Sequence, residues 1–138
     1  MKKILHLKNR RDFIRVAGGI RMVVSTVILQ AAPSLSSTFE PFKVGFTTTK
    51  KIGSAVVRTR VRRRLRAVVR ELFPKFAKNN VEYVLIGRYN TVNCPYQILK
   101  NDIKWALKKA NGMIESGIYK SAQPSLKQQN INHDKNLN

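Results

Sequence analysis

The chain has 138 residues, of which 27 are Lys or Arg and only 7 are Asp or Glu, so its formal net charge is +20 at pH 7. This length fits one domain with a modest core, and a hydrophobic fraction of 43% excludes a purely disordered basic tail. So large an excess of positive charge predicts a polyanionic partner, and nucleic acid is the obvious kind.

The sequence also indicates in which cellular compartment the protein works. The single cysteine, Cys94, excludes an internal disulfide framework and fits a reducing environment. No apolar run reaches membrane-spanning length, because even residues 23–32 are interrupted by polar side chains. The basic start MKKILHLKNRR has too short an apolar part for a secretory signal peptide. We therefore expect a cytoplasmic protein without a membrane partner.

The first half of the chain predicts one helix and two strands. Residues 8–17 have the pattern of a short helix, with Asn9 as a candidate cap and two glycines at its end. The β-branched run 23–30 predicts a strand, and the segment 31–41, which is rich in proline and serine, predicts a loop. Residues 43–49 alternate as a strand with one buried face does, and we expect the two strands to form an antiparallel pair.

A long helix and a buried strand follow. Residues 54–72 predict a helix whose apolar side chains form one narrow stripe: Val57, Val61, Leu65, Val68 and Leu72. Residues 81–87 are almost continuously apolar, as in a strand that is covered on both faces and flanked by parallel neighbours. Strand, helix and strand together predict a β-α-β unit in which the long helix is the crossover.

The last predicted element is an amphipathic helix that begins near Pro95, continues to residue 114 and packs on the sheet. From residue 117 onward the chain is polar, with many Ser, Gln, Asn and Lys residues. We therefore expect a single folded domain over residues 1–116 and a disordered polar tail over residues 117–138.

The chain lacks the clusters that catalysis by the protein itself would need. Its acids are scattered, with no two at a spacing that forces a shared site, which argues against paired-carboxylate and two-metal hydrolysis. His6 and His133 lie near opposite ends of the chain, and KKIGS lacks the first glycine of a phosphate-binding loop. We predict no catalytic and no metal-ligating residue.

The long helix instead predicts a binding function. Outside the apolar stripe, arginines cover most of its circumference: Arg58, Arg60, Arg62, Arg63, Arg64, Arg66 and Arg70. A guanidinium group suits phosphate because it donates two parallel hydrogen bonds. A merely solvated helix face would carry glutamates four residues from the arginines, yet no acid occurs between Glu40 and Glu71. The helix therefore predicts a surface that binds nucleic-acid phosphates.

Two aromatic residues suggest a second feature, and other functions stay open. Phe13 and Phe46 are candidates for a floor on which unpaired bases stack, although both side chains are also typical of a core, Phe46 more than Phe13. A DNA-binding or ribosome-associated protein also fits the composition, but the arginine helix has no short partner helix before it. A membrane-surface helix fits the basic amphipathic pattern, but the apolar stripe lacks Trp and Phe.

The same residues carry a family resemblance. The segments LKNRRDFIRV, KVGFTTTKKIG and EYVLIGR occur in the order and at the spacing of the protein subunit of bacterial ribonuclease P. The signature of that family resembles the residues Lys50, Lys51, Gly53, Ala55, Val56, Arg58, Arg60, Arg63 and Arg66. The resemblance covers about residues 5 to 115, and several linked motifs at consistent spacing are more specific than one short pattern.

The resemblance implies an α+β fold, a two-layer α-β sandwich of the ribosomal-protein-S5 domain 2 type. In that fold the sheet is mixed and four-stranded, and its β-α-β crossover is left-handed, against the usual rule. The resemblance also implies an accessory subunit of a ribonucleoprotein endoribonuclease, in which the RNA subunit and its bound Mg²⁺ remove the 5′ leader of pre-tRNA. The implied partners are the RNA subunit and pre-tRNA, and no protein partner is required.

The family's binding residues can be carried over by position. The RNA-subunit-binding residues implied in this way are Arg58, Thr59, Arg60, Arg62, Arg63 and Arg66. The implied leader-binding residues are Phe13, Thr47, Lys50 and Lys51. A surviving alternative is a basic RNA-binding protein of ribosome assembly with the same fold, which would show no preference for 5′ leaders.

Three positions depart from the family pattern. Thr59 replaces the asparagine of the Arg-Asn-Arg motif, so it keeps a hydroxyl but loses the amide donor. Ala17 stands where many members have a second aromatic residue, and Gln30 stands where others have a strand tyrosine. We therefore expect weaker stacking on the leader, with more of the affinity carried by charge and hence sensitive to salt.

Overall fold

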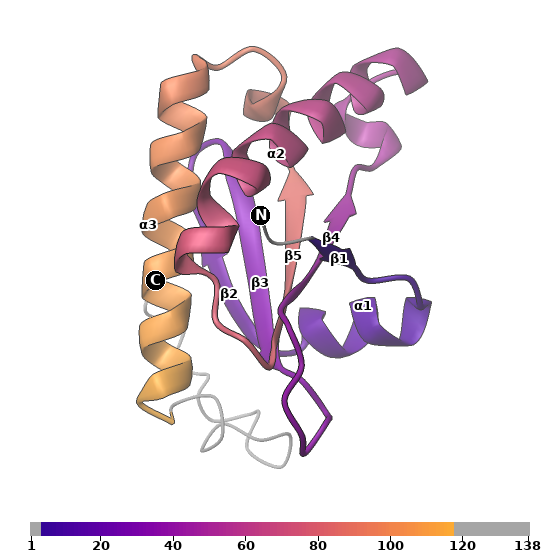
Figure 1. Cartoon of the computed structure of the whole chain (residues 1–138). Helices are drawn as coiled ribbons and strands as arrows, with labels where there is room; N and C mark the ends of the chain where they lie inside the picture. The colour runs from indigo at the N-terminus through magenta and orange to yellow at the C-terminus, as the bar shows by residue number, and fades with distance from the viewer. Residues whose placement is uncertain (1–3, 118–138) are drawn as a thin grey trace, which may run out of the picture.

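The computed structural model describes residues 4–117 of the chain. In chain order, its elements are β1 (Leu5–His6), α1 (Arg10–Ala17), β2 (Ile20–Val23), β3 (Val27–Pro33), β4 (Lys43–Thr47), the 3₁₀ turn η1 (Lys50–Ile52), α2 (Ala55–Phe76), β5 (Val81–Gly87), the 3₁₀ turn η2 (Tyr89–Thr91) and α3 (Tyr96–Glu115). The strands form one mixed sheet in the order β1-β4-β5-β3-β2 (Figure 1). Except for Gly117, the tail predicted over 117–138 lies outside the described residues.

The β4-α2-β5 segment is the β-α-β unit that the sequence predicts. β4 and β5 are parallel neighbours, with Phe46 opposite Leu85, and α2 connects them. β1 continues the parallel pairing on the outer edge of β4, whereas β3 pairs antiparallel with both β5 and β2. β5 is therefore the middle strand of the sheet and has one parallel and one antiparallel neighbour.

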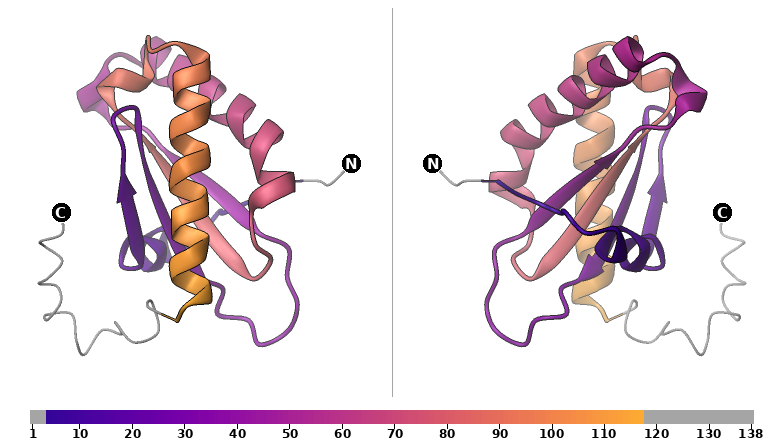
Figure 2. Two further views of the ribbon diagram at one scale, coloured as in Figure 1. Left: turned by 90° about the vertical axis from the view of Figure 1, so that its left-hand side faces the viewer. Right: turned by 90° about the vertical axis from the view of Figure 1, so that its right-hand side faces the viewer.

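Helices lie on both faces of the sheet, because alternate strand residues contribute to two separate cores. Tyr83 and Leu85 belong to the main core with α2 and α3, whereas Val84 packs with Val16 of α1 and with Ala32 in a smaller cluster. The opposite side views in Figure 2 place α3 in front of the sheet in one and α1 in front in the other. The predicted two-layer sandwich describes the sheet with α2 and α3, and the short α1 covers part of the other face.

The strand predictions for the first half of the chain are wrong in three respects. The run 23–30 spans two strands, because the polar residues at 25 and 26 interrupt it and form a hairpin turn. The Val24 amide donates a hydrogen bond to the Val27 carbonyl across this turn (3.0 Å). β3 continues to Pro33, within the predicted loop. β3 and β4 do not pair, because β5 inserts between them, and β1 brings the sheet to five strands where four were expected.

The arginine helix begins as predicted and ends later. The Ser54 hydroxyl caps it by accepting the Val57 amide (3.3 Å). The helix continues to Phe76 and holds Pro74 in its last turn, where the lost amide donor affects only the end of the helix. Phe73 is fully buried with its ring edge-on to Tyr83, and this packing stabilises the last turn.

A buried polar network joins the end of α2 to β5 and α3. The Tyr83 hydroxyl accepts the Lys78 amide (2.9 Å) and donates to Oδ1 of Asn111 (2.6 Å), whose amide nitrogen donates to the Phe76 carbonyl (2.8 Å). Burial raises the pKa of the Tyr83 phenol, so the phenol stays neutral and keeps its proton for Asn111. Three elements that surround the main core are thus linked through one hydroxyl.

Replacing Tyr83 by Phe should therefore lower the free energy of unfolding by about 1–3 kcal/mol, because the partly buried Lys78 amide and the buried Asn111 amide oxygen lose their partner. Urea unfolding followed by circular dichroism measures this difference. Tyr96→Phe is the matched control, because its hydroxyl contacts only the exposed carboxylate of Glu71 (3.0 Å). Equal losses for the two variants would show that the buried network adds nothing.

Candidate nucleic-acid interface

The arginines of α2 have three different surroundings, and the first lies beside η1 and β4. Arg58 donates from Nη1 to the Gly53 carbonyl (2.9 Å), and Arg62 donates from Nη1 to Oγ1 of Thr48 (2.7 Å). Arg62 also donates to the hydroxyl of Thr59 (3.3 Å). These contacts use one or two of the five donors of each guanidinium, which leaves the others for a ligand.

The second surrounding is the loop that leads into α3. Arg60 donates from Nε to the Val92 carbonyl (2.9 Å). Arg64 donates to the carbonyls of Thr91 (3.1 Å) and Val92 (3.0 Å) and also to that of Cys94. Because Arg64 is partly buried and holds three carbonyls, it ties α2 to this loop and is mainly a structural residue.

The third surrounding is solvent. Arg63, Arg66 and Arg70 are exposed, and within residues 4–117 no arginine of α2 forms an ion pair with an acid. Thr59 is exposed between Arg60 and Arg63, and these three side chains line a shallow hollow on the outer face of the helix. α2 therefore exposes positive charge that is not paired with any acid of residues 4–117.

The opposite face of the sheet carries the other predicted site residues. The ring of Phe13 lies so close to Gly45 that a Cβ at that position would be 2.6 Å from two ring atoms. Thr47, two residues further along β4, is half-buried on the same face. Lys50 and Lys51 are exposed in η1, which follows that end of the strand. The structure thus brings Phe13 and Thr47 to one face, with the two lysines at its end.

Phe13 and Phe46 do not form a common stacking floor, so that prediction is wrong. Neighbouring residues of a strand point to opposite faces, and Phe46 follows Gly45 directly. The Phe46 ring faces α2, with the Arg66 guanidinium 5.7 Å from its centroid and the His6 ring 6.2 Å away. Phe13 packs instead against the smaller cluster on the side of α1.

A buried ion pair under α1 was not predicted from the sequence. Arg15 contacts the carboxylate of Glu82 and donates from Nη1 to the Pro33 carbonyl (2.8 Å). Burial raises the pKa of the Glu82 carboxyl, and the charge of Arg15 opposes that effect. The signal was available in the sequence, because an acid in the middle of an apolar strand requires a cationic partner.

Two of the residues that depart from the family pattern also lie toward the face of α1. Ala17 is exposed at the end of α1. Gln30 on β3 is 5% exposed and lies on the same face of the strand as Ala32, which belongs to the smaller cluster. Neither residue has an aromatic ring. Phe13 therefore provides the aromatic ring among the leader-binding residues that the family resemblance implies.

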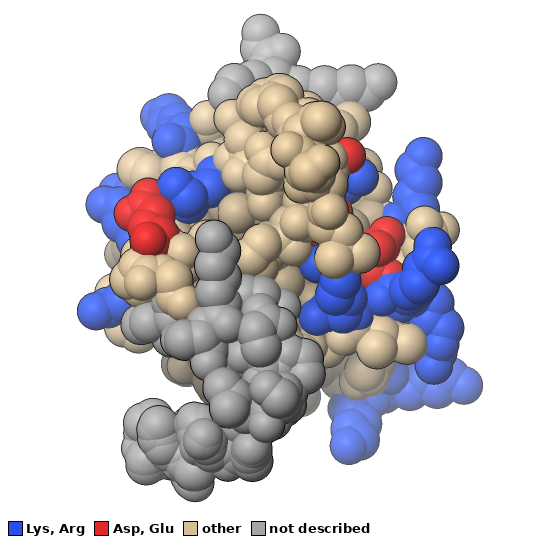
Figure 3. All heavy atoms as spheres, turned by 90° about the horizontal axis from the view of Figure 1, so that it is seen from below, with Lys and Arg blue, Asp and Glu red and all other residues tan. Residues whose placement is uncertain are grey.

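The underside of the molecule shows where charge gathers. In Figure 3, Lys and Arg side chains cluster on the side that carries α1 in Figure 1, and separate ones lie on the side of α3. Within residues 4–117, no group of three His, Cys, Asp or Glu side chains is arranged to hold a metal ion. No helix in the same part of the chain is long and apolar enough to cross a membrane.

Replacing Gly45 by Ala should displace the Phe13 ring, because the new methyl group would lie 2.6 Å from Cε1 and Cζ of the ring and 3.3 Å from Cβ of Leu7. We expect a loss of about 1–3 kcal/mol in the free energy of unfolding, as in other overpacked sites, and shifted Phe13 ring resonances in NMR spectra. Gly112→Ala on α3 is the control, because nothing lies within 4 Å of its Cβ position, and it should stabilise the protein by about 0.5–1 kcal/mol. Unshifted Phe13 resonances in the Gly45 variant would disprove the close contact.

Comparison with known proteins shows the family to which this chain belongs. The family model for ribonuclease P matches residues 1–111. The ribonuclease P protein component of Paramagnetospirillum magneticum is 43% identical over 110 residues, which cover 78% of this chain and 83% of that protein. The corresponding protein of Gluconacetobacter diazotrophicus is 44% identical over 105 residues, which cover 75% of this chain and 89% of that one.

Solved structures share the fold at low sequence identity. The RNase P protein of Staphylococcus aureus superposes with a TM-score of 0.65 at 20% sequence identity, and the superposed region covers 78% of this chain and 96% of the Staphylococcus aureus chain. The RNase P protein of Thermotoga maritima gives a TM-score of 0.64 at 17% identity, with coverages of 75% and 96%. The matched family, the sequence relatives and the fold together show that this chain belongs to the family of bacterial ribonuclease P protein components, the subunits of a ribonucleoprotein endoribonuclease of tRNA processing.

Proposed function

We propose that this protein binds the catalytic RNA subunit through α2 and holds the 5′ leader of pre-tRNA on the face of the sheet that carries α1. The observation that carries the proposal is the separation of two surfaces. The outer arginines of α2 lack acidic partners within the described residues, and the Phe13 cluster lies across the sheet from them. One protein could thus contact both RNAs at the same time.

The arginines of the proposed RNA-subunit site have different roles. Arg63 and Arg66 are exposed and contact phosphates directly, while the partly engaged residues Arg58, Arg60 and Arg62 offer their remaining donors. The Thr59 hydroxyl already accepts a hydrogen bond from Arg62, so it supports that guanidinium where other members of the family have an amide.

The proposed leader site combines one ring with charge. Phe13 offers the part of its ring that is not packed on Gly45 for stacking with an unpaired base. The Thr47 hydroxyl lies on the same face, and Lys50 and Lys51 neutralise leader phosphates at its end. With no second ring at Ala17 or Gln30, binding of the leader depends strongly on charge and weakens as salt rises.

The protein supplies cations, and the RNA supplies the reaction. In this proposal the RNA subunit binds most of the Mg²⁺ and hydrolyses the bond between leader and tRNA. Cations placed along both RNAs reduce the Mg²⁺ concentration that assembly requires. We further infer a cytoplasmic site of action, no requirement for another protein, and the left-handed crossover of the ribosomal-protein-S5 domain 2 fold.

Reconstitution at low Mg²⁺ tests the proposal. The purified full-length protein, a bacterial ribonuclease P RNA, and the two together are incubated with 5′-labelled pre-tRNA, and release of the leader is followed. We expect cleavage only in the mixture. Cleavage by the protein alone, or tight RNA binding without stimulated cleavage, would contradict the proposed role.

Arg63→Gln should weaken binding to the RNA subunit and leave the fold intact, because the Arg63 side chain is exposed and makes no hydrogen bond to residues 4–117. The slope of log K against log salt concentration should fall by about one. Arg64→Gln is the matched control and should mainly lower the melting temperature, because three carbonyls lose their donor. A stability loss for Arg63→Gln equal to that for Arg64→Gln would contradict this division of roles.

Phe13→Leu keeps an apolar side chain in the smaller cluster and removes the aromatic ring. It should weaken binding of leader-bearing pre-tRNA about tenfold relative to mature tRNA, given typical energies of base–aromatic stacking. Binding of both RNAs to the reconstituted holoenzyme is measured by gel shift. An equal loss for pre-tRNA and mature tRNA would remove Phe13 from the leader site.

A further inference from the structure

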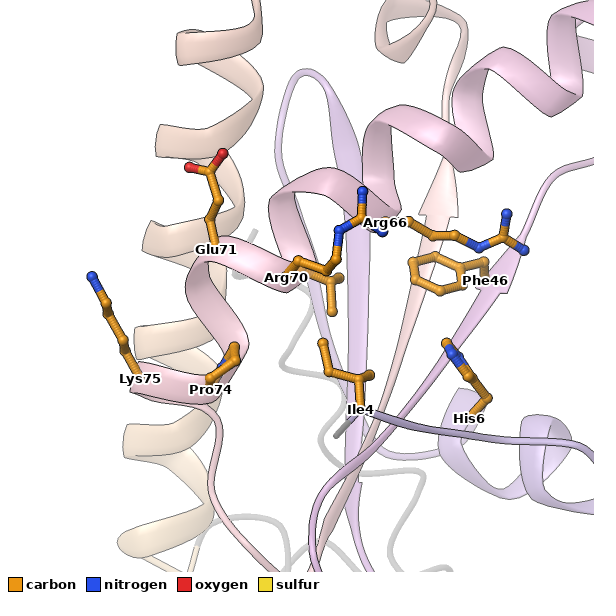
Figure 4. Close-up of a pocket in the computed structure, with 9 residues that line it drawn as sticks. Ile4, His6, Phe46, Arg66, Arg70, Glu71, Pro74 and Lys75 are labelled. Carbon is orange, nitrogen blue, oxygen red and sulfur yellow. The ribbon is translucent and has the colours of Figure 1, made fainter. Parts of the chain in front are cut away.

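A groove lies on the α2 side of the sheet, between the second half of that helix and the β1 edge. Its volume is about 470 Å³, which is within the range of small-ligand sites. It is lined by Ile4, His6, Phe46, Arg66, Val69, Arg70, Glu71, Pro74 and Lys75. Figure 4 shows the side chains of Ile4, His6, Phe46 and Arg66 close together, contributed by β4, by α2 and by the N-terminal segment that includes β1, whereas those of Glu71 and Lys75 point away from them. The site residues assigned by family resemblance include Arg66 but none of the others.

The floor and one wall of the groove suit a flat ring. Ile4, Val69 and Pro74 provide an apolar floor. The wall consists of the Phe46 and His6 rings, whose centroids are 6.2 Å apart with an angle of 48° between their planes. His6 is exposed and Phe46 is half-buried, so both rings keep surface for a ligand.

The rim of the groove is positively charged. The Arg66 guanidinium lies 5.7 Å from the centroid of the Phe46 ring. Arg70 and Lys75 also line the groove, and both residues are exposed. The acid among the lining residues, Glu71, contacts Lys100 of α3 (2.6 Å), and its carboxylate points toward α3 in Figure 4. The hydrogen bond from Lys100 lowers the pKa of Glu71, which keeps this carboxylate charged and engaged outside the groove.

We propose that this groove binds an unpaired nucleotide of the RNA that α2 holds. The base would lie on the apolar floor against Phe46 and His6, and its flanking phosphates would contact Arg66, Arg70 and Lys75. Stacking on rings beside a cationic rim is the chemistry by which single-stranded RNA is bound. The assignment of the nucleotide to the RNA subunit rests on the proposed function, because the sheet separates this groove from Phe13.

The charge of the rim favours a nucleotide over an apolar protein segment. Three cations line an apolar groove of about 470 Å³, and the charge of the neighbouring Glu71 is paired with Lys100 of α3. An apolar helix or strand would leave these cations without counter-charges. A phosphodiester chain brings a charge for each nucleotide and a ring for the floor.

NMR spectroscopy of the full-length protein with a single-stranded adenosine RNA pentamer tests the groove without the RNA subunit. The same pentamer without bases is the ligand control. We expect the adenosine pentamer, and not the abasic one, to shift the Ile4 methyl and His6 ring resonances. In the double variant with His6→Ala and Phe46→Leu, the affinity for the adenosine pentamer that is measured from the Ile4 methyl shifts should fall about tenfold, since stacking on these rings is lost.

Phe76→Leu is the matched protein control. Phe76 is another half-buried ring beside cations, with Lys104 and Lys108 each 5.2 Å from its centroid, but it lies outside the groove. It should leave the affinity for the pentamer unchanged. Equal affinity for the two pentamers, with unshifted Ile4 and His6 resonances, would overturn the proposal. Shifts of the groove resonances that grow with protein concentration alone would also overturn it, because they would indicate that a second copy of the chain occupies the groove.

The outcome can be separated from that of the proposed function. Base-dependent shifts in the groove, together with a protein that fails to stimulate ribonuclease P RNA, would uphold the groove and contradict the function. Stimulated cleavage without these shifts would do the reverse. The Phe13→Leu variant should keep the groove shifts, because its ring lies on the other face of the sheet.

Discussion

Burial of the apolar stripe of α2 is the constraint on which the rest of the structure depends. The arginines of this helix repel one another, and no acid within the helix offsets them before Glu71. The helix is held by tertiary packing, since Val61, Leu65 and Val68 are fully buried and each such side chain contributes about 1.5–3 kcal/mol. Arg64 adds three hydrogen bonds to the loop before α3. This packing fixes which arginines face the solvent.

The sheet then keeps two kinds of surface apart. β5 lies at its centre and supplies Tyr83 to the core under α2 and α3, while Val84, the next residue, supports the cluster under α1. Because the two faces share this strand, their separation is rigid. A rigid separation is what a protein needs if it positions one RNA relative to another, as in the proposed function. The groove beside Phe46 places a further binding feature on the side of α2.

Local patterns predicted the elements that pack by one face, and tertiary pairing decided the others. The stripe of α2, the apolar run of β5 and the amphipathic α3 were predictable because their periodicity reflects burial directly. The neighbours of β3 were not, since a strand from later in the chain inserts beside it. Alternation along β4 placed Gly45 and Phe46 on opposite faces, but the sequence alone could not say that α1 covers the face of Gly45. The groove escaped prediction because Ile4 and Val69 meet only in the folded chain.

Site-specific crosslinking would show whether the two faces contact two different RNAs at once, as we propose. A photoreactive benzophenone side chain at position 59 on the outer face of α2, or at position 47 on the face of α1, would be activated in the complex of protein, RNA subunit and pre-tRNA. We expect crosslinks from position 59 to the RNA subunit and from position 47 to the 5′ leader. Crosslinks from both positions to the same RNA would contradict it.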